Sequence, residues 1–402
     1  MICKLSQGIM KISKNILQMM LLARFGLCRY GSLYWHSQLL QMDSIRQLAD
    51  GVHLSLKEKV MPQKFGFGII GIGNVSTIHA KCIQQIENCK LIAVCSRSEQ
   101  KAKKAAQEYG VPYYTNFVDL IERDDIDVIS ICTPSGMHLE PALAAAQSGK
   151  HVIVEKPIEI KLERADQVID ACQKANVKLA VIFQHRFGEG VQRLRKAVQQ
   201  GHLGKLILGD AYVKWHRTQQ YYDTGGWRGT LKGDGGGALI NQSIHTIDLL
   251  QWIMGPVKTV SGKVGTFTHN IEGEDMGLAL LSFENGAMGI IEGSTSIYPG
   301  FPERLEIHGE KGTVILEGGK IKTWEIQGTK EEPEVLEADR KTGGASDPMA
   351  ISIEGHLAQY RDFIEAIRND REPIVHGIEG RKALEIVLAI YQSSKEGRAV
   401  QL

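Results

Sequence analysis

Between residues 65 and 184 the chain alternates short apolar runs with stretches of helical periodicity, and this alternation restricts its fold more than any other feature. The apolar runs lie at 65–72, 90–96, 126–133, 151–154 and 177–184. Strands that alternate with helices pair in parallel, and right-handed crossovers place the helices on both faces of the sheet. We therefore predict an α/β domain with a doubly wound parallel sheet.

The pattern changes after residue 205, where strand-like segments follow one another with few helices between them. These segments lie at 205–215, 257–268, 276–283, 288–295, 304–310 and 313–318. The pair Asn285-Gly286 separates two of them and is typical of a β-hairpin turn. One helix is expected at 237–254 and two more at 355–370 and 379–394. These features predict a second, α+β domain with an open, mostly antiparallel sheet.

This organisation divides the chain into four parts. We assign 63–186 to the α/β domain, 187–350 to a substrate and oligomerisation domain, and 351–402 to helices that pack back on both. Residues 1–62 contain no Asp or Glu before Asp43, and their apolar patch is interrupted by Arg24. That patch is too short and too broken to cross a membrane. We interpret 1–62 as an extension outside the folded core, with a transit-like presequence or a poor signal peptide as the alternatives.

The composition excludes several classes of partner. The formal net charge is +1, so nothing indicates a nucleic-acid surface or a polybasic membrane patch. The seven cysteines are scattered without a C-x-x-C pair, which favours free thiols in a reducing, cytoplasmic location over disulfides or a zinc site. We expect no metal, no nucleic acid and no membrane among the partners.

The stretch G-I-G-N-V-S follows the first predicted strand and opens the first predicted helix. Gly71 permits a tight turn, and Gly73 lets the backbone approach a pyrophosphate whose charge the helix N-terminus favours. Ser76 replaces the third glycine of the dinucleotide-binding pattern, so the match is imperfect. With Asn74 and Val75 at the helix start, we predict a phosphate-binding turn and interpret 63–186 as a Rossmann NAD(P)-binding domain.

The end of the second predicted strand bears on the choice between NAD and NADP. NAD-binding domains place an acidic residue there, which binds the ribose 2′-hydroxyl. This chain has Ser96 and Arg97 instead, and a guanidinium beside a hydroxyl can hold a 2′-phosphate. The pattern slightly favours NADP as the cofactor and leaves NAD open.

The predicted strand at 151–154 runs into Glu155, Lys156 and Pro157. Ligands of open α/β sheets sit beyond the carboxyl ends of the strands, so an ammonium there can bind a substrate hydroxyl or stabilise developing negative charge. Proline fixes the backbone after Lys156 and thereby directs its side chain. The alternative is a solvated lysine at a strand end. We assign Glu155 and Lys156 to the cofactor site, and Lys156 to substrate binding and catalysis as well.

Asn241 and His245 are four residues apart in the predicted helix 237–254 and therefore share one face. A neutral histidine can accept a hydroxyl proton while hydride leaves the same carbon, although a histidine considered alone is more often structural. We assign both residues to substrate binding and catalysis. Other side chains can stack on a sugar or bind a carboxylate or phosphate, with packing and surface charge as the alternative: Arg186, Arg217, Trp227 and Arg228.

Several motifs occur in order: the glycine turn, C-T-P-S-G-M-H (132–138), V-E-K-P (154–157) and G-G-G-A-L-I followed by His245. In this combination the chain resembles the glucose–fructose oxidoreductase, inositol dehydrogenase and rhizopine catabolism (Gfo/Idh/MocA) family from about residue 65 to its end. The resemblance implies that Lys156 is catalytic or orients the substrate and that His245 is the acid/base. It also places a turn against the cofactor through Thr133, Pro134 and His138.

One position departs from that family. Many members carry aspartate where this chain has Asn241, and an amide cannot take a proton or raise the basicity of His245 by charge. Proton transfer therefore falls to His245, with Lys156 as the nearest helper.

The resemblance further implies a small carbohydrate substrate and a homodimer or homotetramer formed through the open sheet. The expected reaction passes hydride between NAD(P) and a secondary hydroxyl or ketone of a sugar, an inositol or a nucleotide sugar. The loop 214–229 is similar to the branch that oxidises C3 of nucleotide-linked N-acetyl-aminosugars or their uronic acids. Two alternatives stay open: an NAD-dependent glycoside hydrolase with transient C3 oxidation, and a non-catalytic sensor that binds nucleotide and sugar.

Overall fold

The computed structural model describes residues 64–328 and 353–402, which belong to one compact unit. The predicted extension at 1–62 and the end of the predicted substrate domain at 350 lie outside the described residues. Within the described ranges, no helix is both long enough and apolar enough to span a membrane.

The first domain contains a six-stranded parallel sheet with the order β3-β2-β1-β4-β5-β6. Its strands are β1 (Phe65–Ile70), β2 (Cys89–Cys95), β3 (Tyr113–Tyr114), β4 (Val128–Ile131), β5 (His151–Val154) and β6 (Leu179–Val181). The chain order reverses between β1 and β4, which is where a dinucleotide binds in sheets of this order. The predicted Rossmann domain is confirmed.

Helices cover both faces of this sheet. The connections contain α3 (Asn74–Gln85), α4 (Glu99–Tyr109), α5 (Phe117–Ile121), η1 (Ser135–Met137), α6 (Leu139–Gln147) and α7 (Leu162–Lys174). Phe67 and Ile69 of β1 pack with α3 and with the late helix α11 (Ile353–Arg368) in one hydrophobic cluster. Gly68 faces the other side, where a Cβ would lie 2.5 Å from Leu120 of α5. The C-terminal segment thus completes the core of the first domain.

The second sheet has eight strands in the order β13-β12-β11-β7-β10-β9-β8-β14. They are β7 (Leu206–Lys214), β8 (Val257–Gly265), β9 (Met276–Phe283), β10 (Met288–Ser294), β11 (Arg304–Gly309), β12 (Gly312–Glu317), β13 (Lys320–Ile326) and β14 (Val400–Gln401). β10 pairs with β7 in parallel, and the other named pairs are antiparallel. The predicted Asn285-Gly286 hairpin joins β9 to β10, with Gly286 at φ +85°.

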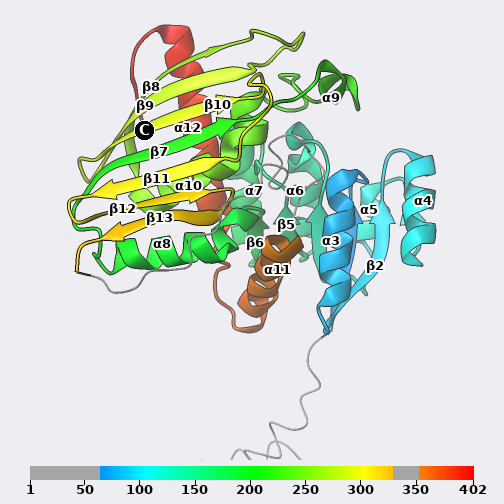
Figure 1. The fold of residues 1–402 in the computed structure, drawn as a ribbon. Helices are drawn as coiled ribbons and strands as arrows, with labels where there is room; N and C mark the ends of the chain where they lie inside the picture. The colour runs from blue at the N-terminus through cyan, green and yellow to red at the C-terminus, as the bar shows by residue number, and fades with distance from the viewer. Residues whose placement is uncertain (1–63, 329–352) are drawn as a thin grey trace, which may run out of the picture. The chain divides into compact units, whose positions relative to one another are not determined.

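The helices of the second domain are η2 (Gln184–Phe187), α8 (Glu189–Gln199), α9 (Gln219–Asp223), η3 (Ala238–Ser243), α10 (Ile244–Met254) and α12 (Gly377–Glu396). α10 packs against β7 and β11, and α12 packs against β8 (Figure 1). The other face of the sheet carries exposed apolar side chains on β9 and β10: Leu278, Leu280 and Met288. This second, α+β domain with an open and mostly antiparallel sheet is the one predicted.

Candidate active site

A cavity of about 1960 Å³ lies between the carboxyl ends of the parallel strands and the second domain. The predicted site residues in its wall are Gly71, Gly73, Asn74, Val75, Ser96, Arg97, Thr133, Pro134, Glu155, Lys156, Arg217, Trp227, Arg228, Asn241 and His245. Two other predicted residues, His138 and Arg186, are not part of this wall. The fold therefore gathers side chains from two domains around one space.

The glycine turn has the geometry that a pyrophosphate requires. Gly71 adopts φ +97°, and a Cβ there would lie 2.6 Å from the Cys132 carbonyl carbon, so only glycine fits. A Cβ at Gly73 would meet no atom within 4 Å, which leaves its backbone open to the cavity at the N-terminus of α3. These residues fit a dinucleotide, because the N-terminus of a helix and its dipole favour phosphates.

Ser76 explains why the third glycine is dispensable. Its hydroxyl accepts a hydrogen bond from Gly73 N at 3.1 Å and donates one to Gly73 O at 2.7 Å. The side chain therefore ties the turn to the first turn of α3, where it is buried. At the end of β2, the exposed Arg97 donates a weak bond from Nη2 to Met137 Sδ at 3.4 Å, which brings its guanidinium toward the turn after β4.

Glu155 and Lys156 extend from the end of β5, and the Lys156–Pro157 peptide bond is cis. Burial works to raise the pKa of Glu155, but hydrogen bonds and charge from His356 and His79 hold it well below its usual range. His79 Nε2 lies 2.9 Å from Glu155 Oε1. Lys156 points to the other domain, where Nζ donates to the main-chain oxygen of Asn241 at 2.6 Å. Burial lowers the pKa of Lys156.

The segment with Asn241 and His245 begins with a turn of π-helix, η3, before α10 continues as a regular helix. The sequence predicted an uninterrupted α-helix here; the wider turn is a difference of a kind that is frequent at functional sites. Both side chains still line the cavity. Asn241 Oδ1 accepts from Gln242 Nε2 at 2.5 Å, so the amide of Asn241 is held in one orientation.

His245 lies in surroundings that favour the neutral form of its ring. Burial first, and then the nearby His185 and Lys156, lower its pKa well below the ordinary value. The ring stacks on His185 with centroids 4.6 Å apart, and it meets the edge of Phe183. Burial also lowers the pKa of His185 to about 4. Within the described residues, His245 Nδ1 has no hydrogen-bond partner.

Asp234 is a site residue that the sequence did not reveal. Asn241 Nδ2 donates to its Oδ1 at 2.5 Å, and Gly229 N donates to its Oδ2 at 3.0 Å. Burial raises the pKa of Asp234 to about 6, and the charge of Lys156 acts in the opposite direction. The carboxylate that many family members carry at position 241 therefore has a counterpart in this chain, one hydrogen bond behind Asn241.

Arg186 requires a correction, because it was predicted to bind substrate. Its side chain is 0% exposed and takes no part in the cavity wall. Nε and Nη2 donate to Asp248 at 2.7 and 2.6 Å, and Nη1 donates to Glu379 at 2.9 Å. Arg186 thus joins η2 to α10 and α12. The position of Arg186 after a predicted strand indicated that it lies near the site, but it did not indicate the direction in which the side chain points.

His138 was predicted to touch the cofactor, and it lies behind the cavity wall instead. Its Nδ1 lies 2.9 Å from Pro157 O, and its Nε2 lies 3.0 Å from Thr133 O. The buried ring therefore links the turn after β4 to the turn after β5. His138 supports Thr133 and Pro134 in the wall rather than contacting the cavity itself.

Two arginines of the loop between β7 and η3 are held against aromatic rings. Arg217 lies over Trp215 at 4.9 Å, and its Nη2 donates to Gln242 Oε1 at 2.8 Å. Arg228 lies over Tyr221 at 4.7 Å and over Trp227 at 5.4 Å. Aromatic faces stabilise guanidinium groups and restrict their motion. This wall of the cavity therefore carries fixed positive charge beside flat apolar surfaces.

The absence of a metal stays a prediction. The fold brings together two groups of imidazole and carboxylate side chains among the described residues: His79, Glu155 and His356, and Asp210, Glu306 and His308. In the first group His79 is already engaged on both ring nitrogens, by Glu155 and by Ser130. Sequence spacing cannot show such groups, because their members come from separate elements.

A sheet of this order, with an open glycine turn and with a lysine and a neutral histidine in one cavity wall, defines an oxidoreductase that uses a nicotinamide dinucleotide. Residues 65–183 match the oxidoreductase family with an NAD-binding Rossmann fold, and residues 191–315 match the Gfo/Idh/MocA C-terminal domain. The chain belongs to the Gfo/Idh/MocA family and is an NAD-binding oxidoreductase. The family that the motifs predicted is confirmed.

This chain matches several relatives over nearly the whole length of each relative. The WlbA dehydrogenase from Bordetella pertussis, solved with NADH and UDP-GlcNAcA, is 33% identical with a TM-score of 0.76, covering 85% of this chain and 99% of that one. Myo-inositol 2-dehydrogenase of Thermotoga maritima is 26% identical, covering 83% of this chain and 98% of the relative. D-glucoside 3-dehydrogenase of Escherichia coli is 27% identical, covering 86% and 100%.

Proposed function

We propose that the protein transfers hydride between NAD(P) and a secondary hydroxyl of a nucleotide-linked N-acetyl-aminosugar or its uronic acid. One observation carries this proposal: Lys156, Asn241 and His245 line the same cavity as the open glycine turn. The named relatives act on sugars and inositols, and the WlbA structure contains UDP-GlcNAcA. Each is similar to this chain, and together they support the substrate class.

The bound nicotinamide supplies a hydride acceptor or donor. His245 accepts the hydroxyl proton during oxidation, because its lowered pKa keeps the ring neutral at neutral pH. Lys156 donates a hydrogen bond to the reacting oxygen, where developing negative charge strengthens the contact. Asn241, fixed by Asp234 and Gln242, orients the hydroxyl without exchanging protons.

The loop between β7 and η3 suits the remote part of such a substrate. Arg217 and Arg228 offer planar donor groups that match a carboxylate or a phosphate. Trp227 beside Arg228 offers a flat surface for a sugar ring. A cavity of about 1960 Å³ exceeds the size of a pocket for a single drug-sized ligand, on the order of 300–1,000 Å³, and is consistent with a dinucleotide and a nucleotide sugar bound together.

The test incubates the purified protein with NAD and NADP against a panel of sugars, inositols and nucleotide sugars, and follows the absorbance of reduced nicotinamide. Lys156→Ala and His245→Ala are expected to lower kcat by about a hundredfold or more, as for loss of an acid/base group, and His245→Ala is expected to bind cofactor normally. Full activity in both variants contradicts the site. Net accumulation of reduced cofactor separates a dehydrogenase from a hydrolase with transient oxidation.

The preference between the two cofactors is part of the same proposal. Ser96 and Arg97 favour a 2′-phosphate, whereas the solved WlbA relative contains NADH. We expect Arg97→Ala to weaken NADP binding by about tenfold, as for a charge-assisted contact, and to leave NAD binding nearly unchanged. Equal loss of affinity for both cofactors in a fluorescence titration contradicts a role in the choice.

We also propose a homodimer or homotetramer formed through the open face of the second sheet, in a cytoplasmic location. Leu278, Leu280 and Met288 support the first part, since exposed apolar patches mark subunit contacts. The cysteines of the described ranges are free thiols, which is typical of a reducing compartment.

A further inference from the structure

Two adjacent buried carboxylates, Glu274 and Asp275, immediately precede β9. The two side chains contact different parts of the molecule: Glu274 bonds to the start of η3, and Asp275 bonds to the turn 267–269. We propose that these residues position the two halves of the substrate site separately. Glu274 sets the segment with Asn241 and His245, and Asp275 sets the loop with Arg217. The kinetic part of this inference rests on the proposed function.

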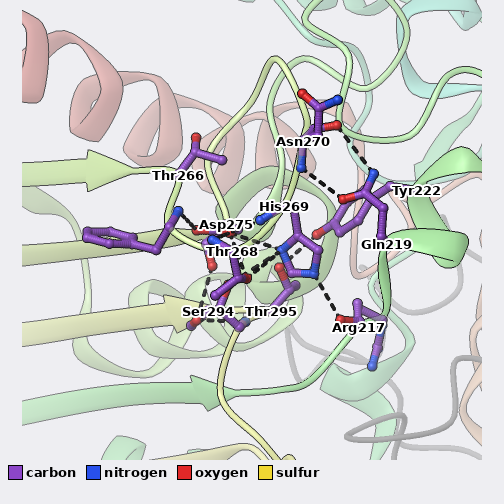
Figure 2. Close-up of polar contacts among 12 residues, drawn as sticks. Arg217, Gln219, Tyr222, Thr266, Thr268, His269, Asn270, Asp275, Ser294 and Thr295 are labelled. Atoms are coloured by element: carbon purple, nitrogen blue, oxygen red, sulfur yellow. Dashed lines mark hydrogen bonds and ion pairs between the residues drawn. The ribbon is translucent and has the colours of Figure 1, made fainter.

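Asp275 organises the turn that faces the Arg217 loop (Figure 2). Its Oδ1 accepts a hydrogen bond from Phe267 N at 2.8 Å, and its Oδ2 accepts from Thr268 N at 2.8 Å and from His269 N at 3.0 Å. Burial works to raise the pKa of Asp275, but these bonds lower it to about 2. The carboxylate is therefore ionised and holds the turn 267–269 in one conformation.

His269 transmits this order to the substrate loop. Its Nδ1 lies 3.0 Å from Asp275 Oδ2, and its Nε2 lies 2.9 Å from the main-chain oxygen of Arg217 (Figure 2). Through its two ring nitrogens, His269 therefore bridges the Asp275 carboxylate and the main chain of Arg217. Tyr222 packs its ring edge-on against His269 at 4.8 Å. We call Asp275 and His269 the clasp.

Further bonds close the same contact. Gln219 and Asn270 bond to each other through Gln219 Nε2 to Asn270 O at 3.3 Å and Asn270 N to Gln219 Oε1 at 2.8 Å (Figure 2). Tyr222 Oη lies 2.7 Å from Thr295 Oγ1, and Thr295 N donates to Asp275 O at 2.9 Å. The loop that begins at Arg217 is thus fixed at several points to residues around the clasp.

Glu274 acts on the other side, at the start of η3. Its Oε2 accepts from Gly237 N at 3.0 Å, and its Oε1 accepts from Leu239 N at 2.7 Å and from Tyr391 Oη at 2.8 Å. Its main-chain oxygen accepts from Ala238 N at 2.8 Å. The first N–H groups of a helix lack partners within the helix, and the helix dipole favours a negative charge at that end. Glu274 therefore fixes the beginning of the segment that presents Asn241 and His245.

The two halves serve different steps of the proposed reaction. Arg217 contacts the remote part of the substrate, so disorder in its loop weakens binding and raises KM. Asn241 and His245 contact the reacting carbon's hydroxyl, so a shift of η3 lowers kcat. A change at Asp275 is therefore expected to raise KM, whereas a change at the adjacent Glu274 is expected to lower kcat.

The first experiment needs no substrate. It compares hydrogen–deuterium exchange of the full chain in wild type, Asp275→Asn and Glu274→Gln. Asp275→Asn is expected to raise exchange in 215–224 and not in 237–245, and Glu274→Gln the reverse. His269→Ala serves as a milder second variant of the clasp. Glu284→Gln, an exposed carboxylate at the other end of β9, is the matched control and should change neither segment.

The second experiment measures kinetics on a substrate that wild type turns over. Asp275→Asn and His269→Ala are expected to raise KM for the sugar by about tenfold with kcat little changed, and Glu274→Gln to lower kcat by about tenfold. Cofactor affinity checks that each variant is folded. The inference is overturned if both carboxylate variants raise exchange in the same segments and lose the same kinetic constant. It is also overturned if neither variant differs from wild type in exchange or kinetics. If wild type oxidises no sugar, the proposed function fails while the exchange result still decides the positioning roles.

Discussion

At the scale of single residues, the stacked pair of His185 and His245 determines how the site responds to pH. A second cation cannot form cheaply next to Lys156 in a buried space, so both rings stay neutral. A lowered pKa means that the base form of His245 persists as the pH falls, and that it is lost only when the pH falls through the lowered value.

We therefore expect kcat for sugar oxidation to show no loss due to His245 between about pH 8 and about pH 6.5, the ordinary histidine pKa. His185→Phe keeps a stacked ring but removes a group that lowers the pKa of His245. The acid limb of the kcat–pH profile of this variant should therefore move to higher pH. A wild-type profile with its acid limb at the ordinary value would falsify the assignment. The measurement is kcat against pH at saturating cofactor.

Asp234 gives a second prediction at this scale. Asp234→Asn removes the negative charge that favours the Lys156 ammonium, and it leaves one acceptor oxygen for the two donors Asn241 Nδ2 and Gly229 N. We expect kcat to fall by about tenfold, as for a hydrogen bond to a charged group, with unchanged affinity for NAD(P). Asp170→Asn on α7, an exposed position, is the control. Loss of cofactor binding in Asp234→Asn contradicts the role assigned to Asp234.

At the scale of helices and strands, the ion pair of Arg186 and Asp248 holds α10 against the end of the parallel sheet. Both side chains are buried, with 0% and 1% exposure. Charges removed from water are tolerated only in pairs, so breaking one side leaves the other uncompensated. His245, the proposed acid/base, lies one turn before Asp248 on the same helix, and this ion pair therefore fixes the helix that carries His245.

Asp248→Asn is expected to lower the free energy of unfolding by about 3 kcal/mol, measured by urea denaturation. The double variant Arg186→Met, Asp248→Leu should recover part of that loss, because Glu379, the other partner of Arg186, keeps its ion pair with Lys382. Glu99→Gln, in the exposed pair with Lys103 on α4, should change the stability little. A double variant less stable than Asp248→Asn contradicts the explanation.

The local patterns of the sequence predicted most elements correctly. Alternating apolar runs identified the parallel strands, and Asn285-Gly286 identified a hairpin, because both signals act between near neighbours. The direction of Arg186 could not be predicted, since its partners lie 62 and 193 residues away. Asp234 and Asp275 were missed although their partners lie only five to eight residues away, because those contacts depend on the conformation of irregular loops that no motif marks.

At the scale of the whole molecule, the open sheet face has the character of a subunit contact. Leu278, Leu280 and Met288 are 46%, 61% and 63% exposed on the neighbouring strands β9 and β10. We expect Leu280→Glu to lower the mass measured by light scattering on a sizing column, because a charge cannot be buried there without a partner. Val118→Glu, on α5 of the other domain, is the control. An unchanged mass for Leu280→Glu places the subunit contact elsewhere.

The bond from Lys156 Nζ to the main-chain oxygen of Asn241 joins the two domains at the reacting point itself. Any hinge opening that separates the Rossmann domain from the second sheet must break this bond, which frees the ammonium and withdraws His245 from it at once. A separation of the two domains to exchange ligands would therefore also take the proposed catalytic residues apart, so that the complete set exists only in the closed arrangement.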